Sequence, residues 1–194
     1  MASSAPAKME SELHGHCEEI ERIAGDARKL CEGLSDTQFN WSPAPGRWSI
    51  AQCMTHLNAV TAIDLPMIAA EIEKAKVAGK FESGPFRYGF LSKWFVRFMD
   101  APAKTKTKAP KTYVPPPEAP CQKTLDEFIA HHNRLAELVK RANGLDLRRV
   151  KVPSPVGKWI KFPLGQRFAL VLSHDRRHLW QANRVRKEAD FPML

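Results

Sequence analysis

The sequence has no long apolar run. Nowhere do about eighteen uncharged apolar residues follow one another, as a membrane-spanning helix requires. The N-terminal stretch MASSAPAKMESELHG also lacks the hydrophobic segment of a secretion signal. We therefore expect a soluble, cytoplasmic protein with no membrane partner.

Cysteine is scarce, and the four residues that occur are scattered at positions 17, 31, 53 and 121. None forms the C-x-x-C pair that structural zinc sites and redox motifs use. Cys17 and Cys31 fall in one predicted helix, where a rise of about 1.5 Å per residue would separate them by about 20 Å and forbid a disulfide. We expect free thiols in a reducing compartment.

Acidic residues are outnumbered, and the formal net charge of +9 favours anionic partners in general. The densest basic cluster, AKTKTKAPK, precedes the proline run VPPP and contains Lys104, Lys106, Lys108 and Lys111. A nucleic-acid tether is one interpretation, but no aromatic residues are interleaved for base stacking. Alternating Lys and Thr with prolines is typical of a solvated connector. We therefore predict a connector at about residues 100–120 and no nucleic-acid partner.

Apolar periodicity and helix signals predict four long helices. The first covers about residues 9–32. The second begins at a capping box formed by Ser49 and Gln52 and continues to about residue 78. Pro66 lies inside this second helix and should kink it.

The third helix is expected over about residues 124–143, with Thr124 as its cap and Glu127 as the partner in a second capping box. The fourth follows Pro163 and covers about residues 164–187. Between them, VKVPSPVGKWIKF has the composition of a short irregular hairpin.

Four amphipathic helices with one long connection between the second and the third predict an all-α four-helix bundle. The length of 194 residues suits a single domain, which we expect to span residues 1–194. Residues 1–8 are expected to form a disordered tail.

Two histidines near the C-terminus stand four residues apart in LSHDRRHLWQANR. On a helix of 3.6 residues per turn, His174 and His178 share one stripe with apolar residues, namely Leu164, Val171, Ala182 and Val185. His56 lies in the stripe of the second helix, with Cys53, Val60, Ile63 and Met67. Each imidazole could hydrogen-bond a neighbouring helix, but three inward histidines with an i,i+4 pair favour a metal site.

The motif H-x-x-x-H also occurs in metalloproteases, which place a general-base Glu after the first histidine. Here Asp175 occupies that place, one methylene shorter, and no histidine follows to complete the site. A protease is therefore disfavoured.

The other polar and aromatic candidates have plainer interpretations. We expect His132 and His16 to be core or interfacial histidines rather than a fourth ligand, and His14, His131 and Asp64 to lie on the surface. We interpret three tryptophans as packing anchors at helix ends rather than a substrate cage: Trp41, Trp48 and Trp180.

Two stretches resemble the DinB-like family of metal-dependent enzymes, also called YfiT-like. LSDTQFNWSPAPGRWSIAQCMTHL looks like that family's entry into its second helix, and LSHDRRHLWQ looks like its fourth-helix H-x-x-x-H motif. The likeness covers roughly residues 10–188. It implies a four-helix bundle with one divalent ion, whose ligands correspond here to His56, His174 and His178.

The resemblance implies a function as well, because relatives of known activity use thiols such as bacillithiol or mycothiol in S-transfer or isomerisation, and others are described as hydrolases. We predict a metal-dependent enzyme, a thiol-dependent S-transferase or a hydrolase of a small molecule. Three imidazoles would leave at least one coordination position open for water or a thiol. The expected cofactors are a divalent ion (Zn, Ni or Fe) and a low-molecular-weight thiol, and no further catalytic residue is singled out.

The alternative is a non-catalytic bundle that carries metal as a structural or sensing element and binds nucleic acid or another anionic partner. A closed fourth ligand, either His132 or His16, would favour that alternative. A homodimer is compatible with both hypotheses.

Overall fold

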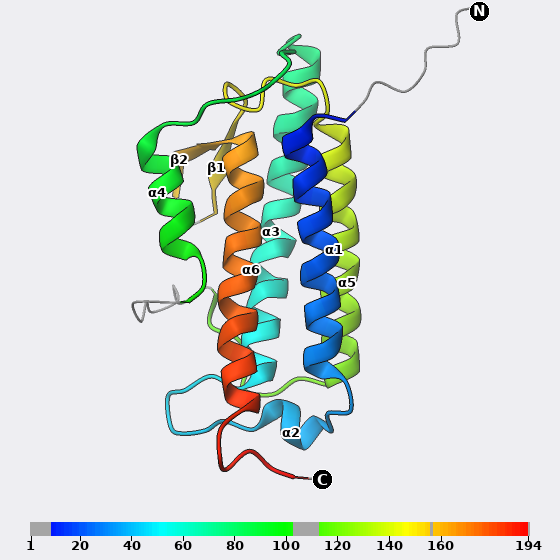
Figure 1. Ribbon diagram of the computed structural model, residues 1–194, viewed down its shortest axis with the longest axis vertical. Coiled ribbons are helices and arrows are strands. Elements are labelled where there is room, and N and C mark those ends of the chain that lie inside the picture. Colours follow the sequence, from blue (N-terminus) through cyan, green and yellow to red (C-terminus); the bar gives the residue numbers. More distant parts are fainter. Residues whose placement is uncertain (1–8, 103–112, 156, 194) are drawn as a thin grey trace, which may run out of the picture.

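The computed structural model describes residues 9–102, 113–155 and 157–193. Four long helices lie side by side in it (Figure 1): α1 (Ser11–Cys31), α3 (Ile50–Val77), α5 (Cys121–Arg141) and α6 (Leu164–Arg186). The predicted four-helix bundle is therefore confirmed. In the part of the chain that is described, no helix has the length and apolar character needed to cross a bilayer.

Three smaller elements accompany the bundle. Two are short helices, α2 (Asp36–Asn40) and α4 (Phe90–Met99), which the sequence did not predict. The third is the antiparallel hairpin of β1 (Lys151–Ser154) and β2 (Gly157–Pro163), with a register shift after Pro153. The expected irregular hairpin is confirmed.

The order of the helices around the bundle explains the long middle connection. Both α1 and α3 pack against α5 and α6, so α1 and α3 lie on a diagonal. Figure 1 shows that α3 and α5 run in the same direction. The chain must therefore return along the bundle between them, which a short turn cannot do. Helix α4 lies on this return path and packs against α6.

Helix α6 is buried on more than the single stripe that the sequence predicts. Helices α1 and α3 cover one side of it, while α4 and the hairpin cover another. Polar side chains on α6 are consequently buried as well, namely Gln166, Arg167, Ser173, Asp175 and Arg177. Buried polar groups of this kind need partners, and those partners shape the site described below.

The start of α3 matches its prediction. The Ser49 hydroxyl accepts a hydrogen bond from the Gln52 backbone N–H at 3.1 Å, and the Gln52 side chain accepts one from the Ser49 N–H at 3.1 Å. Pro66 lies inside α3, which continues across it. The expected inner stripe is wrong in one turn, because Ile63 is 41% exposed whereas Asp64 is only 3% exposed.

The start of α5 differs from the prediction. The helix begins at Cys121, three residues before the expected cap. The Asp36 carboxylate of α2 accepts a hydrogen bond from the Cys121 backbone N–H at 2.7 Å, and it thereby supplies the partner that a capping side chain would supply. Thr124 instead lies within the helix and donates its hydroxyl to the Pro120 carbonyl at 2.7 Å.

Two sequence-based interpretations fall outside the described residues. These are the disordered tail at residues 1–8 and the solvated character of the lysine cluster at residues 104–111. Both stay predictions.

Candidate metal centre

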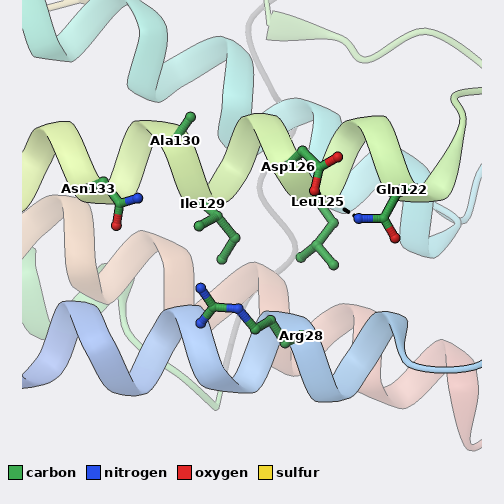
Figure 2. A pocket seen from close by; sticks show the side chains of 7 residues that line it. All are labelled: Arg28, Gln122, Leu125, Asp126, Ile129, Ala130 and Asn133. Atoms are coloured by element: carbon green, nitrogen blue, oxygen red, sulfur yellow. Dashed lines mark hydrogen bonds between the residues drawn. The ribbon is translucent and has the colours of Figure 1, made fainter.

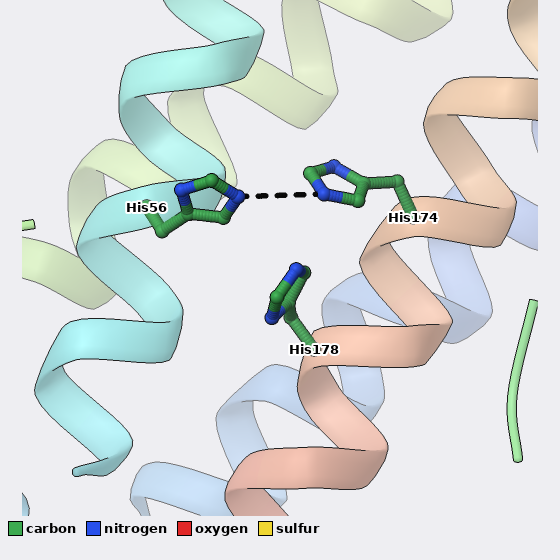
Figure 3. Close-up of side chains that lie close together, drawn as sticks. All are labelled: His56, His174 and His178. Carbon is green, nitrogen blue, oxygen red and sulfur yellow. Dashed lines mark hydrogen bonds between the residues drawn. The ribbon is translucent and has the colours of Figure 1, made fainter. Parts of the chain in front are cut away.

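Three histidines from two helices face one another inside the bundle. His56 comes from α3, and His174 and His178 come from adjacent turns of α6 (Figure 3). One ligand atom of each lies within 4.8 Å of those of the other two, and the Nε2 atoms of His56 and His174 are 3.4 Å apart. The predicted ligands are thus brought together, and we call them the histidine cluster.

A hydrogen bond to a backbone carbonyl fixes the orientation of the His56 ring. Its Nδ1 lies 2.8 Å from the backbone carbonyl of Tyr113, to which it can only donate. The other nitrogen, Nε2, is then unprotonated in the neutral ring and directs its lone pair into the cluster. A backbone carbonyl that fixes the tautomer of a histidine is a usual partner of metal-ligating imidazoles.

Trp48 closes one side of the cluster. Its ring stacks on His178 at 5.6 Å with an interplanar angle of 27°, and its centroid lies 5.0 Å from that of His56. The capping box of α3 fixes the residue that follows Trp48 in the chain, and so helps to position the indole. The Nδ1 atom of His178 is buried with no hydrogen-bond partner among the described residues.

The cluster favours neutral imidazoles. Burial lowers the pKa of His178 to about 3, with the neighbouring His56 and Arg177 adding to the effect. Burial also lowers the pKa of His56, although the hydrogen bond to Tyr113 opposes the change. The pKa of His174 lies well below its usual range because of burial and its histidine neighbours. At neutral pH all three rings therefore offer lone pairs without competition from protons.

The geometry fits a divalent transition-metal ion. Two ligands at about 2.0–2.1 Å from a tetrahedral ion lie about 3.3 Å apart, close to the 3.4 Å between the Nε2 atoms of His56 and His174. Neutral imidazole donors suit Zn, Ni, Fe and Cu better than Mg or Ca, which prefer oxygen.

The fourth-ligand hypothesis for His132 receives no support. Its Nδ1 lies 2.9 Å from the Phe128 carbonyl, and its Nε2 lies 3.1 Å from the carboxylate of Asp175. Both nitrogens are thus used, and the predicted core histidine is confirmed. The contact with His132 directs the Asp175 carboxylate toward α5 and away from the histidine cluster. Asp175 is therefore not placed to act as the general base of a metalloprotease, which the sequence already disfavoured.

Three other predicted placements have mixed outcomes. His14 is exposed beside Glu18, as expected, and His16 borders the core, with its ring 5.9 Å from that of Phe168. The surface placement of His131 is wrong, because this residue is partly buried.

The surface placement of Asp64 is also wrong. Its carboxylate forms a buried ion pair with Arg167 across the interface between α3 and α6. The two residues are 103 positions apart in the chain, so helical periodicity alone could not pair them.

One of the three tryptophans, Trp41, acts as the predicted anchor away from the cluster, whereas the contact that the structure gives for Trp180 is a cation–π contact and not core packing. Trp41 packs edge-on against Phe191 at 5.6 Å, and Arg184 lies over the ring of Trp180 at 5.0 Å. Trp48 packs as well, but against the histidine cluster. The sequence signal that could have found it is its place next to the helix cap, eight residues before His56.

A surface groove lies on the opposite side of the bundle. It has a volume of about 410 Å³ and runs between α1 and α5 (Figure 2), with a lining of Arg28, Gln122, Leu125, Asp126, Ile129, Ala130 and Asn133. The histidine cluster lies between α3 and α6 instead. We therefore do not assign the groove to the metal centre.

The fold and the site together define a helical bundle with an internal three-histidine cluster. The model of the DinB superfamily matches residues 19–182, and the chain belongs to this superfamily. Among solved structures, the chain is similar to YfiT from Bacillus subtilis, described as "a probable metal-dependent hydrolase with an unusual four-helix bundle topology". The two are 14% identical with a TM-score of 0.60, over 95% of this chain and 91% of YfiT. A comparison with curated proteins gives no significant match.

Proposed function

We propose that this protein is a metal-dependent enzyme that binds one divalent ion, Zn, Ni or Fe, through His56, His174 and His178. The observation that carries the proposal is the convergence of three neutral, inward imidazoles whose ligand atoms lie within 4.8 Å of one another. Membership of the DinB superfamily and likeness to a probable metal-dependent hydrolase support it.

The reaction that this site suits best is hydrolysis or thiol transfer on a small molecule. A divalent ion bound there supplies Lewis acidity, which can lower the pKa of a water or a thiol at an open position. Three uncharged ligands leave that Lewis acidity undiminished, and three protein ligands are the usual number in catalytic zinc sites. A low-molecular-weight thiol is the proposed second cofactor.

The chain's own residues orient and shield the site. The Tyr113 carbonyl holds His56 in the tautomer that exposes Nε2. The Trp48 ring covers His178 and excludes water from that side. One domain over residues 1–194, cytoplasmic localisation and a homodimer stay predictions that accompany this proposal.

The test begins with protein purified without chelator and without affinity nickel. We expect elemental analysis to give close to one divalent ion per chain, and chelation to remove both the ion and turnover of ester, amide or thiol-plus-electrophile substrates. Adding back the ion should restore turnover. Cobalt(II) substitution gives a readout that is independent of activity, because its visible spectrum reports ligand number and geometry.

The matched control is His14→Ala, which removes an exposed histidine from α1. This variant should keep both the ion and the activity. If chelation unfolds the protein according to circular dichroism, the ion is structural, and the non-catalytic bundle replaces the enzyme as the better account.

A further inference from the structure

Helix α4 presents an apolar face to solvent. Phe90 is 83% exposed, Leu91 75%, Trp94 49% and Phe98 37%, and no residue of α4 is buried. At 100° per residue these four side chains fall on one face of the helix, and the rings of Trp94 and Phe98 stack at 5.5 Å. We call them the outer face of α4. An apolar cluster of this kind on a helix surface marks an interaction site.

The outer face is held in place by contacts on the other side of the helix. The Phe95 ring lies 5.4 Å from that of Phe162 on β2. At the C-terminal end, the guanidinium of Arg176 donates two hydrogen bonds to the Asp100 carboxylate, at 2.8 and 2.7 Å. The neighbouring Arg177 donates to the Phe98 carbonyl at 3.2 Å. The apolar residues are therefore presented by a docked helix, which loses little conformational entropy when it binds a partner.

Positive charges flank the outer face. Lys93 and Arg97 lie on one edge of it, both exposed, and Arg87 is exposed shortly before the helix. Within the described residues these three side chains form no hydrogen bond or ion pair. Helix α4 has no acidic residue, and Asp100 at its end is already paired with Arg176. The cations are thus available to an anionic partner.

Charge complementarity decides between the occupants. A second copy of this chain would bring the same cations to a symmetric interface, with no acid on α4 to offset them. An anionic bilayer offers both things that the face lacks, namely an apolar interior for the rings and phosphate charge for Lys93 and Arg97. A ten-residue helix is too short to cross a bilayer but can lie in its interface.

We propose that the outer face of α4 binds the surface of an anionic phospholipid bilayer, with Phe90, Leu91, Trp94 and Phe98 inserted among the lipids and Lys93 and Arg97 at the phosphates. This departs from the sequence-based expectation of no membrane partner, which rested on the absence of a spanning run. The proposal is independent of the metal centre, since none of these residues belongs to the histidine cluster.

The test is co-sedimentation of the full chain with vesicles. We expect binding to phosphatidylcholine mixed with phosphatidylglycerol, and little binding to phosphatidylcholine alone. Raising the salt from about 0.1 M to about 1 M shortens the Debye length from about 10 Å to about 3 Å and should release much of the protein. Tryptophan emission should shift to the blue on binding, and Trp94→Phe should remove most of that shift.

Two pairs of variants assign the binding to α4. Phe90→Ser with Leu91→Ser, and Lys93→Glu with Arg97→Glu, should each weaken binding at least about tenfold. Val77→Ser, at an apolar position on α3 that is 91% exposed, is the control for the first pair. Lys123→Glu with Arg134→Glu, both exposed on α5, makes the same change in net charge and is the control for the second.

Three results would overturn the proposal. One is a failure to bind anionic vesicles, or equal binding to neutral vesicles. Another is a loss of binding in the control variants equal to the loss in the α4 variants, which would show that overall charge or altered folding causes the loss. The third is a dimer in solution, measured by light scattering, that the Phe90→Ser and Leu91→Ser changes dissociate, because a second copy would then cover the face.

Discussion

Two groups of buried polar side chains cross the same interface between α3 and α6, and they differ in what they lack. Asp64 and Arg167 form an ion pair, in which each charge is the other's partner. The histidine cluster, which starts at His56 eight residues earlier on α3, has no anion and no cation of its own. It consists of three lone-pair donors directed at one another.

The difference shows which group needs something from outside. A buried ion pair of opposite charges needs no further ligand, although breaking it is costly. Burial keeps the three imidazoles neutral, and the hydrogen bond among them is the long contact of 3.4 Å between the Nε2 atoms of His56 and His174. A cation at their centre satisfies all three at once. The first group is therefore complete without a ligand, and the second is the candidate for chemistry.

The largest expected effect is the loss of the metal in His178→Ala. Divalent-ion affinity should fall by more than about 1,000-fold, since even the outer partners of metal ligands are worth about 10–100-fold. Helix content should stay near that of the wild type, because the apolar core carries the fold. Isothermal titration of chelator-stripped protein with zinc measures the first quantity, and circular dichroism measures the second. An affinity within tenfold of the wild type, as we expect for His14→Ala, would refute the ligand assignment.

The second effect is on the free energy of unfolding, and it distinguishes the ion pair of Asp64 and Arg167 from the histidine cluster. Asp64→Asn leaves the Arg167 charge buried without a counter-charge, and we expect it to lower the free energy of unfolding by about 3 kcal/mol. Replacing both residues with leucine should cost much less, since no charge is then left unpaired. Urea denaturation measures both values, and zinc affinity should change little in either variant. A larger loss in the double variant than in Asp64→Asn would contradict the comparison.

The third effect is a dependence of the stability of the metal-free protein on pH. The cluster histidines have lower pKa values in the folded state than the usual 6.5, so the unfolded chain binds protons first as the pH falls. Their contribution to stability is intact above about pH 6.5 and is lost as the pH falls toward the folded values, by roughly 1 kcal/mol per histidine over one pH unit.

Urea denaturation between about pH 7 and about pH 5 checks this slope. His132 acts in the opposite sense, because Asp175 raises its pKa despite burial, and its contribution is lost only as the pH rises. The control replaces all three cluster histidines with glutamine, which should flatten the slope below about pH 6.5. An unchanged slope would show that these residues are not the groups that titrate.

The smallest expected effects concern the residues around the cluster. Trp48→Leu should weaken zinc binding less than about tenfold, because the indole shields His178 and orients it without donating a ligand. Tyr113→Phe should leave the affinity unchanged within error, because His56 uses the backbone carbonyl of Tyr113 and not its hydroxyl. Zinc titration measures both, and a larger loss in Tyr113→Phe than in Trp48→Leu would contradict the geometry.

What could be predicted from the sequence depends on local signals. The capping box at Ser49 is a local signal, and it predicted the start of the second helix. The i,i+4 spacing of His174 and His178 is local as well, and it predicted two ligands on the fourth helix. His56 needed only the periodicity of its own helix. Helix α4 was missed although four of its apolar residues share one helical face, because it is only ten residues long and no capping side chain marks its start.

The remaining features depend on partners that are distant in the chain. Asp64 looks like a surface residue until Arg167 is placed beside it, and α5 begins early because Asp36 reaches its first turn. The hydrogen bond that orients His56 comes from a backbone carbonyl, which has no sequence signature. Such contacts follow from the packing of the bundle and not from the local pattern.

X-ray absorption spectroscopy at the zinc edge of the loaded protein shows whether three imidazoles bind one ion. We expect three imidazole nitrogens at about 2.0–2.1 Å from the zinc, completed by oxygen ligands and with no sulfur bound to the ion. Fewer than three imidazoles, a sulfur ligand from a cysteine, or the same spectrum from His178→Ala would contradict it.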